Sequence, residues 1–208
     1  GKEVELTEET DVLDTWFSSQ LWPFSTMGWP EKTKDFEKFF PTDALVTAAD
    51  IIFFWVSRMI MISEYLFDEI PFKYVYLNGI VRDEKGRKMS KTLGNSPDPL
   101  DLIDKYGADA IRFSLLYNTS QGQDIFFSEK LLEMGANFSN KVWNASKFVL
   151  QNLEDFDYKT SISDLEFKLE DRWILSKLQN AAKGVNNALD GYELDMAAKT
   201  AYEFFRGE

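Results

Sequence analysis

The chain has 208 residues and a formal net charge of -12, from 23 lysines and arginines against 35 aspartates and glutamates. Hydrophobic residues make up 44% and aromatic residues 15%, a composition typical of a folded globular chain. The negative charge argues against indiscriminate binding to nucleic acid or to an anionic membrane, and no membrane partner is expected. Cysteine and histidine are absent, which excludes disulfides, thiolate- or histidine-ligated metal sites and any mechanism that needs an imidazole base from this chain.

Three tryptophans, two prolines and a glycine lie close together between residues 11 and 30. Such a composition favours a rigid, irregular segment over a long helix or strand. Residues 31–40 then have the pattern of a short amphipathic helix, which the following proline ends.

Two short apolar runs flank a long apolar segment. Residues 44–47 and 74–77 predict strands, and residues 51–67, apolar on nearly every face, predict a helix buried within a domain. The order strand, helix, strand predicts a parallel βαβ unit, in which ligands bind beyond the carboxyl ends of the strands. Asp50 and the pair Asn78-Gly79 lie at these expected ends, and so does the basic segment that follows.

That basic segment combines three cations, two hydroxyls and two glycines within ten residues. Lysines supply compact point charges, hydroxyls and backbone N–H groups supply donors, and glycines let the backbone approach a ligand, so the composition suits a mobile loop that binds phosphate oxygens. The alternative is a solvated charged turn. The segment reads Gly86-Arg87-Lys88-Met89-Ser90-Lys91-Thr92-Leu93-Gly94-Asn95.

The remainder of the chain is predicted to be helical. Asp98 is placed to cap a helix that begins at Pro99 and stops at Gly107. A boundary is expected near residue 128, where the pattern changes to long amphipathic helices. The further helices are predicted over 110–117, 128–153, 171–189 and 193–205.

The strand-end residues together with the loop 86–95 resemble the class I aminoacyl-tRNA synthetases, whose "KMSKS" signature is similar to the loop and its Gly-Asn sequel. The resemblance implies an α/β fold: the carboxyl-terminal half of a Rossmann-like catalytic domain over residues 1–128, then a helical connection and the start of an anticodon-binding domain over 129–208. The whole chain is expected to be rich in helix.

Several segments are similar to the valyl-tRNA synthetases within that family. The resemblance implies a ligase that activates valine with ATP and transfers it to tRNA(Val). ATP is expected with Mg²⁺ as substrate, with no protein-bound metal, in a cytoplasmic monomer. The chain itself is expected to be an inactive fragment, because it lacks the histidine signature of the family's nucleotide site. The similar segments are 11–24, 50–60, 107–113, 140–145 and 171–175.

The same resemblance implies roles for individual side chains. Lys88 and Lys91 are the expected catalytic cations, which stabilise charge on the phosphates. Two further groups are implied. Plain core packing is the alternative for Trp16 and Ile51, and an N-cap of the next helix is the alternative for Asp50. The two groups are ATP contacts at Asp50, Asn78, Gly79, Met89, Ser90 and Lys91, and an amino-acid pocket formed by Trp16, Ile51 and Trp55.

The sequence departs from the family pattern at a few of these positions. Ala48 stands where a glycine is common, Ala49 where a larger residue is usual, and Asn78 replaces a frequent histidine. Thr92 replaces the more common serine and keeps its hydroxyl.

The helical part offers cations that are expected to meet tRNA phosphates or else to lie on a solvated helix face. Two other functions remain open: a non-catalytic tRNA-binding or interaction module, and a nucleotidyltransferase of related fold. The cations are Lys141, Arg172, Lys177 and Lys183, and the nearby aromatic residues expected in the core are Trp143, Trp173 and Phe204.

Overall fold

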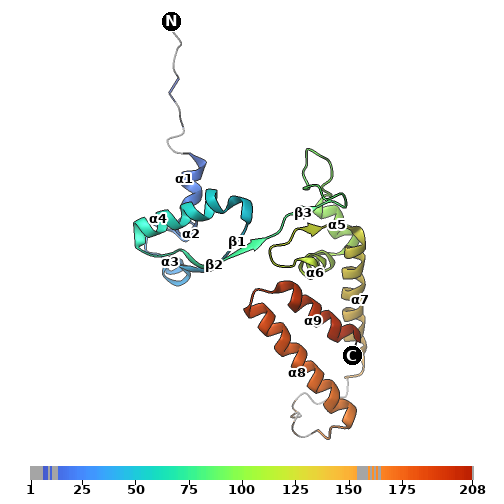
Figure 1. Ribbon diagram of the computed structural model, residues 1–208. Coiled ribbons are helices and arrows are strands. Elements are labelled where there is room, and N and C mark those ends of the chain that lie inside the picture. The colour runs from blue at the N-terminus through green and yellow to red at the C-terminus, as the bar shows by residue number, and fades with distance from the viewer. Residues whose placement is uncertain are drawn as a thin grey trace. The chain divides into compact units, whose positions relative to one another are not determined.

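The computed structural model describes residues 7–8, 10, 14–153, 159, 161, 163 and 165–207. The chain forms two compact units, Gly1–Asn78 and Gly79–Glu208, and each is considered by itself (Figure 1). The first three residues of the motif that begins at residue 11, Asp11, Val12 and Leu13, lie outside the described residues.

The first unit begins with short helices and continues into a strand–helix–strand arrangement. The side chains of Asp14 and Thr33 cap two of the helices, accepting hydrogen bonds from the N–H groups of Trp16 (3.4 Å) and Phe36 (3.1 Å). The predicted irregular segment is thus a series of short helices and turns. Its elements are α1 (Thr15–Gln20), α2 (Trp22–Ser25), α3 (Lys34–Phe39), β1 (Thr42–Ala48), the 3-10 helix η1 (Ala49–Ile51), the π-helix η2 (Ile52–Val56), α4 (Ser57–Phe67) and β2 (Phe72–Asn78).

The two strands of this unit are paired in parallel, which confirms the predicted βαβ unit. Their register runs from Thr42 opposite Phe72 to Ala48 opposite Asn78, so both strands end at the same edge. The polar residues that follow β1 and end β2 are therefore brought to one edge of the sheet.

The prediction of one fully buried helix over 51–67 is wrong. The backbone passes through η1 and η2 before it becomes α-helical, and only one stripe is buried. Val56 and Met59 pack with Phe72 of β2, whereas Phe53 is 74% and Tyr65 84% exposed. The two-stranded sheet covers only one side of this helical segment, so many of its apolar side chains stay exposed.

Aromatic rings form the second core of the first unit. Phe24 is fully buried, with its ring at an edge-to-face angle to Trp29, Phe40 and Phe67 at centroid distances of 5.0–6.0 Å. Such arrangements contribute about 0.5–1.5 kcal/mol per pair beyond the area they bury. Ring packing therefore holds Phe24 and Trp29 in place, and the expected rigidity of residues 11–30 stays a prediction.

The second unit contains a short parallel pair of strands and long helices. Asp98 caps α5 as predicted, accepting from the N–H of Leu100 at 2.8 Å, with Pro99 as the first helical residue. The strand pair was not predicted, because each strand is two residues long and the two lie far apart in the sequence. The elements are β3 (Val81–Arg82), α5 (Pro99–Tyr106), α6 (Ala108–Asn118), β4 (Ile125–Phe126), α7 (Glu129–Gln151), α8 (Leu169–Asp190) and α9 (Leu194–Gly207).

The helices of this unit meet at small residues. A Cβ built on Gly135 of α7 would lie 2.5 Å from the carbonyl oxygen of Ala110 on α6, so the two helices approach closely there. The Ser114 hydroxyl donates to the carbonyl of Leu131 at 2.6 Å beside this crossing. Helices α8 and α9 pack against each other, and α9 also packs on α6 (Figure 1).

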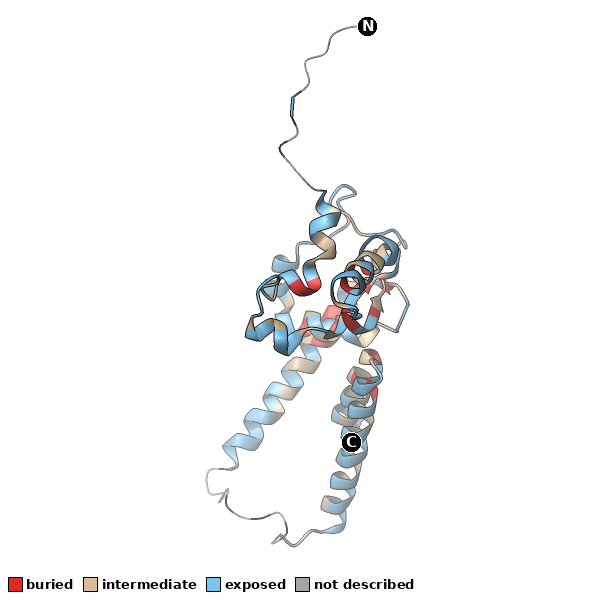
Figure 2. Cartoon of the chain, turned by 90° about the vertical axis from the view of Figure 1, so that its left-hand side faces the viewer, coloured by how far each residue is buried: buried red, intermediate tan, exposed pale blue. Residues whose placement is uncertain are grey.

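The prediction that Trp143 and Trp173 lie in the core is wrong, since they are 72% and 48% exposed. Trp143 lines an open groove of about 620 Å³ between α6 and α7, and the ammonium of Lys177 lies 5.5 Å from the Trp173 ring centroid. Phe204 is half-buried. Figure 2 shows long helices that are exposed over much of their length. Among the described residues, no helix is long and apolar enough to cross a membrane.

Candidate functional site

The basic loop 86–95 follows β3, not β2 directly as predicted (Figure 1). The chain turns back on β3: the N–H of Asp83 donates to the carbonyl of Arg87 at 2.9 Å, and the N–H of Met89 to that of Val81 at 3.2 Å. Gly86 lies in this turn with φ of 77°, a left-handed conformation that glycine adopts without strain. The loop therefore starts from a tight hairpin and not from an open coil.

The carboxylate of Asp83 is the centre of the loop's hydrogen bonds. Its Oδ1 accepts from the backbone N–H groups of Lys85 (3.0 Å) and Arg87 (2.9 Å). Its Oδ2 accepts from Arg87 Nε (2.8 Å) and Asn95 Nδ2 (2.9 Å) and lies 2.7 Å from Arg87 Nη2. The hydrogen bond from Asn95 and those from Arg87 hold the pKa of Asp83 well below its usual range, against the opposing effect of burial.

Asn95 closes the other end of the loop. Its Oδ1 accepts from the N–H of Ser90 at 2.9 Å, and its Nδ2 donates to the Lys88 carbonyl at 3.4 Å as well as to Asp83. Within the loop, Ser90 Oγ accepts from the N–H of Leu93 at 3.2 Å. One amide thus joins the middle of the loop to its base.

A second carboxylate anchors the strand from which the loop leaves. Asp124 accepts from the N–H of Ile80 at 2.9 Å and from Arg82 Nε. The pKa of Asp124 is lowered, first by the Ile80 hydrogen bond and then by Arg82. Arg82 also donates to the carbonyl of Gly86 at 3.2 Å, which connects this ion pair to the turn.

The expected catalytic lysines lie on the outside of this framework. Lys88 and Lys91 are exposed, whereas Met89 and Ser90 are half-buried. Met89 lines a pocket of about 340 Å³ whose other walls include Asp83, Glu84 and Glu129. A pocket with this lining disfavours phosphate, so the lysine side of the loop is the favourable one for an anion.

Glu129 at this pocket is already engaged. Its carboxylate accepts from Lys105 Nζ at 2.8 Å and from the Tyr106 hydroxyl at 2.7 Å. The Lys105 hydrogen bond lowers the pKa of Glu129, and the same bond raises the pKa of Lys105. These groups therefore connect α5 to the start of α7.

The strand-end residues of the first unit are brought together only in part. Asn78 is opposite Ala48 at the end of the sheet, and Asp50 lies within η1, two residues beyond. The alternative that Asp50 caps a helix beginning at Ile51 is wrong, because the residue before η1 is Ala48 and no side chain caps it.

Gly79 has a structural role in the second unit. A Cβ at this position would lie 1.7 Å from the carbonyl oxygen of Gln123, so only glycine lets the two backbone segments pass. This close approach is enough to explain why position 79 is a glycine, and contact with a nucleotide is not needed to explain it.

The predicted amino-acid pocket residues belong to neighbouring elements. The Trp16 ring of α1 lies 5.7 Å from the Phe54 ring of η2, and the Arg58 guanidinium lies 5.1 Å from the Trp16 centroid. Ile51 directly precedes η2 and is half-buried, as is Trp16, while Trp55 within η2 is 40% exposed. All three keep surface that a small apolar ligand can contact.

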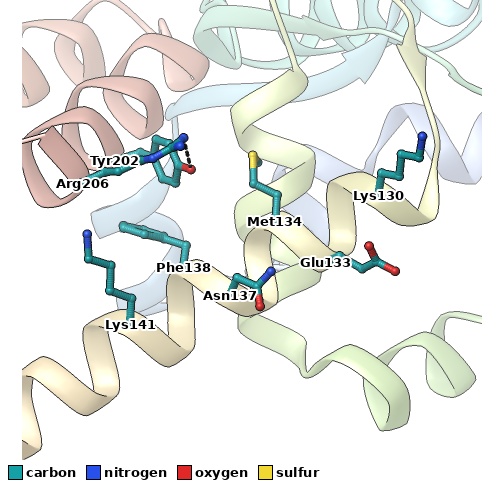
Figure 3. A pocket seen from close by; sticks show the side chains of 8 residues that line it. All are labelled: Lys130, Glu133, Met134, Asn137, Phe138, Lys141, Tyr202 and Arg206. Atoms are coloured by element: carbon teal, nitrogen blue, oxygen red, sulfur yellow. Dashed lines mark hydrogen bonds between the residues drawn. The ribbon is translucent and has the colours of Figure 1, made fainter.

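A basic groove of about 410 Å³ lies between helices of the second unit. Figure 3 shows Lys130 at one end of the lining and Lys141 with Arg206 at the other. Arg206 Nη1 donates to the Tyr202 hydroxyl at 3.1 Å, which orients its guanidinium. The full lining is Lys130, Glu133, Met134, Asn137, Phe138, Lys141, Tyr202 and Arg206.

The structure separates the predicted tRNA-facing cations. Of these only Lys141 lines the groove, whereas Arg172, Lys177 and Lys183 lie on α8. Arg172 and Lys183 are exposed and Lys177 is half-buried against Trp173. Among the described residues, no three acidic side chains are grouped so as to hold a metal ion.

Sequence reasoning missed the residues that hold the loop. Asp83 lies within a basic region, where no local pattern marks it as a hydrogen-bonding centre, and Asp124 lies far along the chain. Asn95, the last residue of the motif, could have indicated such a hydrogen-bonded base, because an asparagine amide can donate and accept at the same time.

Comparison with known families matches two parts of the chain. The family described as tRNA synthetases class I (I, L, M and V) matches residues 1–128. The family described as the anticodon-binding domain of tRNA ligase matches residues 171–208.

Curated relatives match the whole chain. The valine--tRNA ligase of Fusobacterium nucleatum is 64% identical over 209 residues, covering 100% of this chain and 24% of that protein. That of Fervidobacterium nodosum is 55% identical over 201 residues, covering 97% of this chain and 23% of that protein. The chain therefore spans about a quarter of the length of these relatives.

Solved structures share the fold at low identity. A ternary complex of Agrobacterium radiobacter LeuRS with tRNA and LeuAMS superposes with a TM-score of 0.85 at 24% identity, covering 95% of this chain and 26% of that one. Mycobacterium tuberculosis methionyl-tRNA synthetase in complex with methionyl-adenylate gives 0.72 at 22% identity, covering 91% and 38%.

Proposed function

Because the chain belongs to the class I tRNA synthetase family, we propose that it contributes part of the active site of an enzyme that activates valine with ATP and transfers it to tRNA(Val). The observation that carries the proposal is the loop 86–95, which combines a hydrogen-bonded base with exposed Lys88 and Lys91. The identity to valine--tRNA ligases supports valine as the amino acid.

In the proposed first step, a carboxylate oxygen of valine attacks the α-phosphorus of ATP. A bond forms between carboxylate and phosphorus, the bond between the α- and β-phosphates breaks, and pyrophosphate leaves. Lys88 and Lys91 neutralise the charge that develops on the phosphates, so the loop acts by electrostatics and needs no covalent step. ATP enters as its magnesium complex, with the metal as part of the substrate.

In the proposed second step, a hydroxyl of the terminal ribose of tRNA attacks the valyl carbonyl and AMP leaves. Asp50 and Asn78 are placed at one sheet edge and are proposed to accept from or donate to the nucleotide. In the loop, the Ser90 hydroxyl and the backbone at Met89 are proposed as further ATP contacts. Gly79 stays a predicted contact, although its structural role already accounts for it.

The proposed amino-acid pocket consists of Trp16, Ile51 and Trp55. A valine side chain has no polar group, so such a pocket selects by shape, and one methylene is worth about 1–3 kcal/mol of discrimination. Their remaining exposed surface supports this role.

A second candidate function is tRNA binding without catalysis by this chain. The observation in its favour is the basic groove, in which Lys130 and Lys141 of α7 and Arg206 of α9 line one hollow that can receive phosphates. Filter binding of the chain to tRNA tests this function. The salt concentration is varied between about 50 and 200 mM, because binding through phosphate contacts weakens strongly over that range. A salt slope that is smaller by about 0.9 in Lys141→Ala, and unchanged in the exposed control Lys147→Ala, is the expected sign of a phosphate contact.

Several other statements stay predictions: the division into a catalytic part, 1–128, and a helical part, 129–208, the cytoplasmic location and the monomeric state. A nucleotidyltransferase of related fold remains the alternative enzyme. ATP–pyrophosphate exchange distinguishes the two, because only the proposed activity requires valine for the exchange.

The decisive test is Lys91→Ala in the full-length protein that carries this sequence. Removal of one preorganised charge contact is expected to lower valine-dependent ATP–pyrophosphate exchange about 100-fold or more, equivalent to ~3 kcal/mol. The exposed turn residue Lys85 provides the matched control, since Lys85→Ala keeps its backbone hydrogen bond to Asp83. Unchanged exchange in Lys91→Ala would contradict the proposal.

A further inference from the structure

One carboxylate joins the start, the turn and the end of the basic loop. Asp83 precedes the turn, Arg87 follows it, and Asn95 is the last residue of the loop, yet both donate to the same oxygen of Asp83. The Asp83 side chain is only 13% exposed. A solvated turn does not require a carboxylate with this many partners.

We propose that Asp83 and Asn95 form a clamp, a pair of positioning residues that holds the loop 86–95 in the conformation that presents Lys91 to the phosphates of ATP. The inference rests on the proposed function of the loop. Neither residue is placed at the reacting atoms; each acts through the backbone that carries the lysines.

The chemistry of the two side chains suits this role. Asn95 accepts from the N–H of Ser90 and donates to Asp83, so it needs one acceptor and one donor on the same side chain. Asp83 also pairs with the guanidinium of Arg87, so the charge of Arg87 is already neutralised within the loop. Lys91, which is exposed, is the cation of the loop that the clamp is proposed to present to the anion.

Loss of the clamp is expected to lower the fraction of loops in the binding conformation. The apparent affinity for ATP falls by the same factor as that fraction. The KM for ATP should therefore rise while the KM for valine stays unchanged, because the predicted valine pocket is formed by other elements. A purely structural loss would affect both.

The experiment uses Asp83→Asn, Asn95→Asp and the exchanged pair Asp83→Asn with Asn95→Asp in the full-length protein. In Asp83→Asn the amide group turns an N–H toward existing donors, and in Asn95→Asp two carboxylates face each other. Each single change is expected to raise the KM for ATP in valine-dependent exchange about tenfold. Both changes break the same contact, so the exchanged pair is expected to stay within about threefold of either single variant and not to reach the roughly hundredfold product of independent sites.

Tryptic cleavage at Arg87, Lys88 and Lys91 gives a second measurement, in which both single variants should be cut faster than the parent. Asp104→Asn, an exposed carboxylate on α5, is the matched control. An unchanged KM for ATP in the single variants, a roughly hundredfold rise in the exchanged pair, or an equal rise in the KM for valine would each overturn the clamp. Failure of the proposed function is recognised separately, by exchange that does not respond to Lys91→Ala.

Discussion

The two regions proposed to meet substrate are held in place by different forces. Around Trp16, the contacts are the Phe54 ring at 5.7 Å and the Arg58 guanidinium at 5.1 Å, and elsewhere in the same unit Phe24 packs in an aromatic cluster. At the loop 86–95, the contacts are hydrogen bonds to Asp83 and Asn95. The first region depends on shape and packing, the second on charge and hydrogen bonding.

This difference matches the ligands proposed for each region. An apolar side chain is recognised by a surface that keeps its shape, which interlocked rings provide. A phosphate is recognised by cations whose position is fixed before the charge develops. The comparison predicts that the two regions respond to different perturbations.

The largest effect is expected for Phe24→Ala. Removal of a fully buried ring costs about 3–5 kcal/mol of unfolding free energy, because the surrounding rings collapse only partly into the cavity. Urea unfolding of the chain measures it. Phe53→Ala, at a ring that is 74% exposed, is the control and should change the free energy by less than about 0.5 kcal/mol. Similar effects at both positions would contradict the packed core.

Gly79→Ala tests whether a glycine near the proposed nucleotide site serves the fold. The added Cβ meets the Gln123 carbonyl oxygen at 1.7 Å, so the backbone must shift, with an expected loss of about 1–3 kcal/mol. The loss should be seen by urea unfolding without ATP. Gly207→Ala, where a Cβ has open space, is the control. If only ATP binding changed in Gly79→Ala, the structural explanation would be wrong.

Trp16→Ala sharpens the comparison at the apolar region. Loss of about 1.4 kcal/mol of pocket contact corresponds to a tenfold rise in the KM for valine, with the KM for ATP unchanged. Valine-dependent exchange by the full-length protein measures both constants. Trp22→Ala, at an exposed ring on α2, provides the control. An unaltered KM for valine would remove Trp16 from the pocket.

The smallest effect is expected from acid and should be confined to the polar region. The folded-state pKa of Asp83 lies below its usual value of 3.8, so this carboxylate stabilises the fold fully above about pH 4 and loses that contribution as the pH falls toward the lowered pKa. Asp83→Asn should therefore flatten the dependence of unfolding free energy on pH below 4. Urea midpoints between pH 2 and 6 measure it, and an unchanged slope would argue against the hydrogen-bonded state.

Much of the architecture was predictable from local signals. The parallel βαβ unit, the Asp98 cap and the helix breaks at Pro41 and Gly107 each depend on residues close together in sequence. The loop was found for the same reason, since its charges and glycines are contiguous. Family resemblance added the roles of its lysines.

The features that were missed depend on residues far apart or on the extent of a surface. Asp124 reaches Ile80 from a distant segment, and no local pattern identifies this pair. Trp143 is exposed in the groove between α6 and α7. Its apolar character alone does not indicate how much of it the neighbouring helix covers. The π-helical turn of η2 likewise leaves no clear mark in an apolar run.

The short pairing of β3 with β4 has a consequence for how the second unit opens. Two backbone hydrogen bonds, from Ile125 to Ile80 at 3.0 Å and from Phe127 to Arg82 at 2.8 Å, close a segment that contains the loop, α5 and α6. Because Asp124 also accepts from Ile80 and Arg82 beside this strand pair, the ends of the segment separate only when all of these contacts break together. Amide hydrogen exchange at Ile125 and Phe127 should therefore follow a single cooperative opening, and protection at these two positions measures how tightly the segment that contains the loop 86–95 is tied to the rest of its unit.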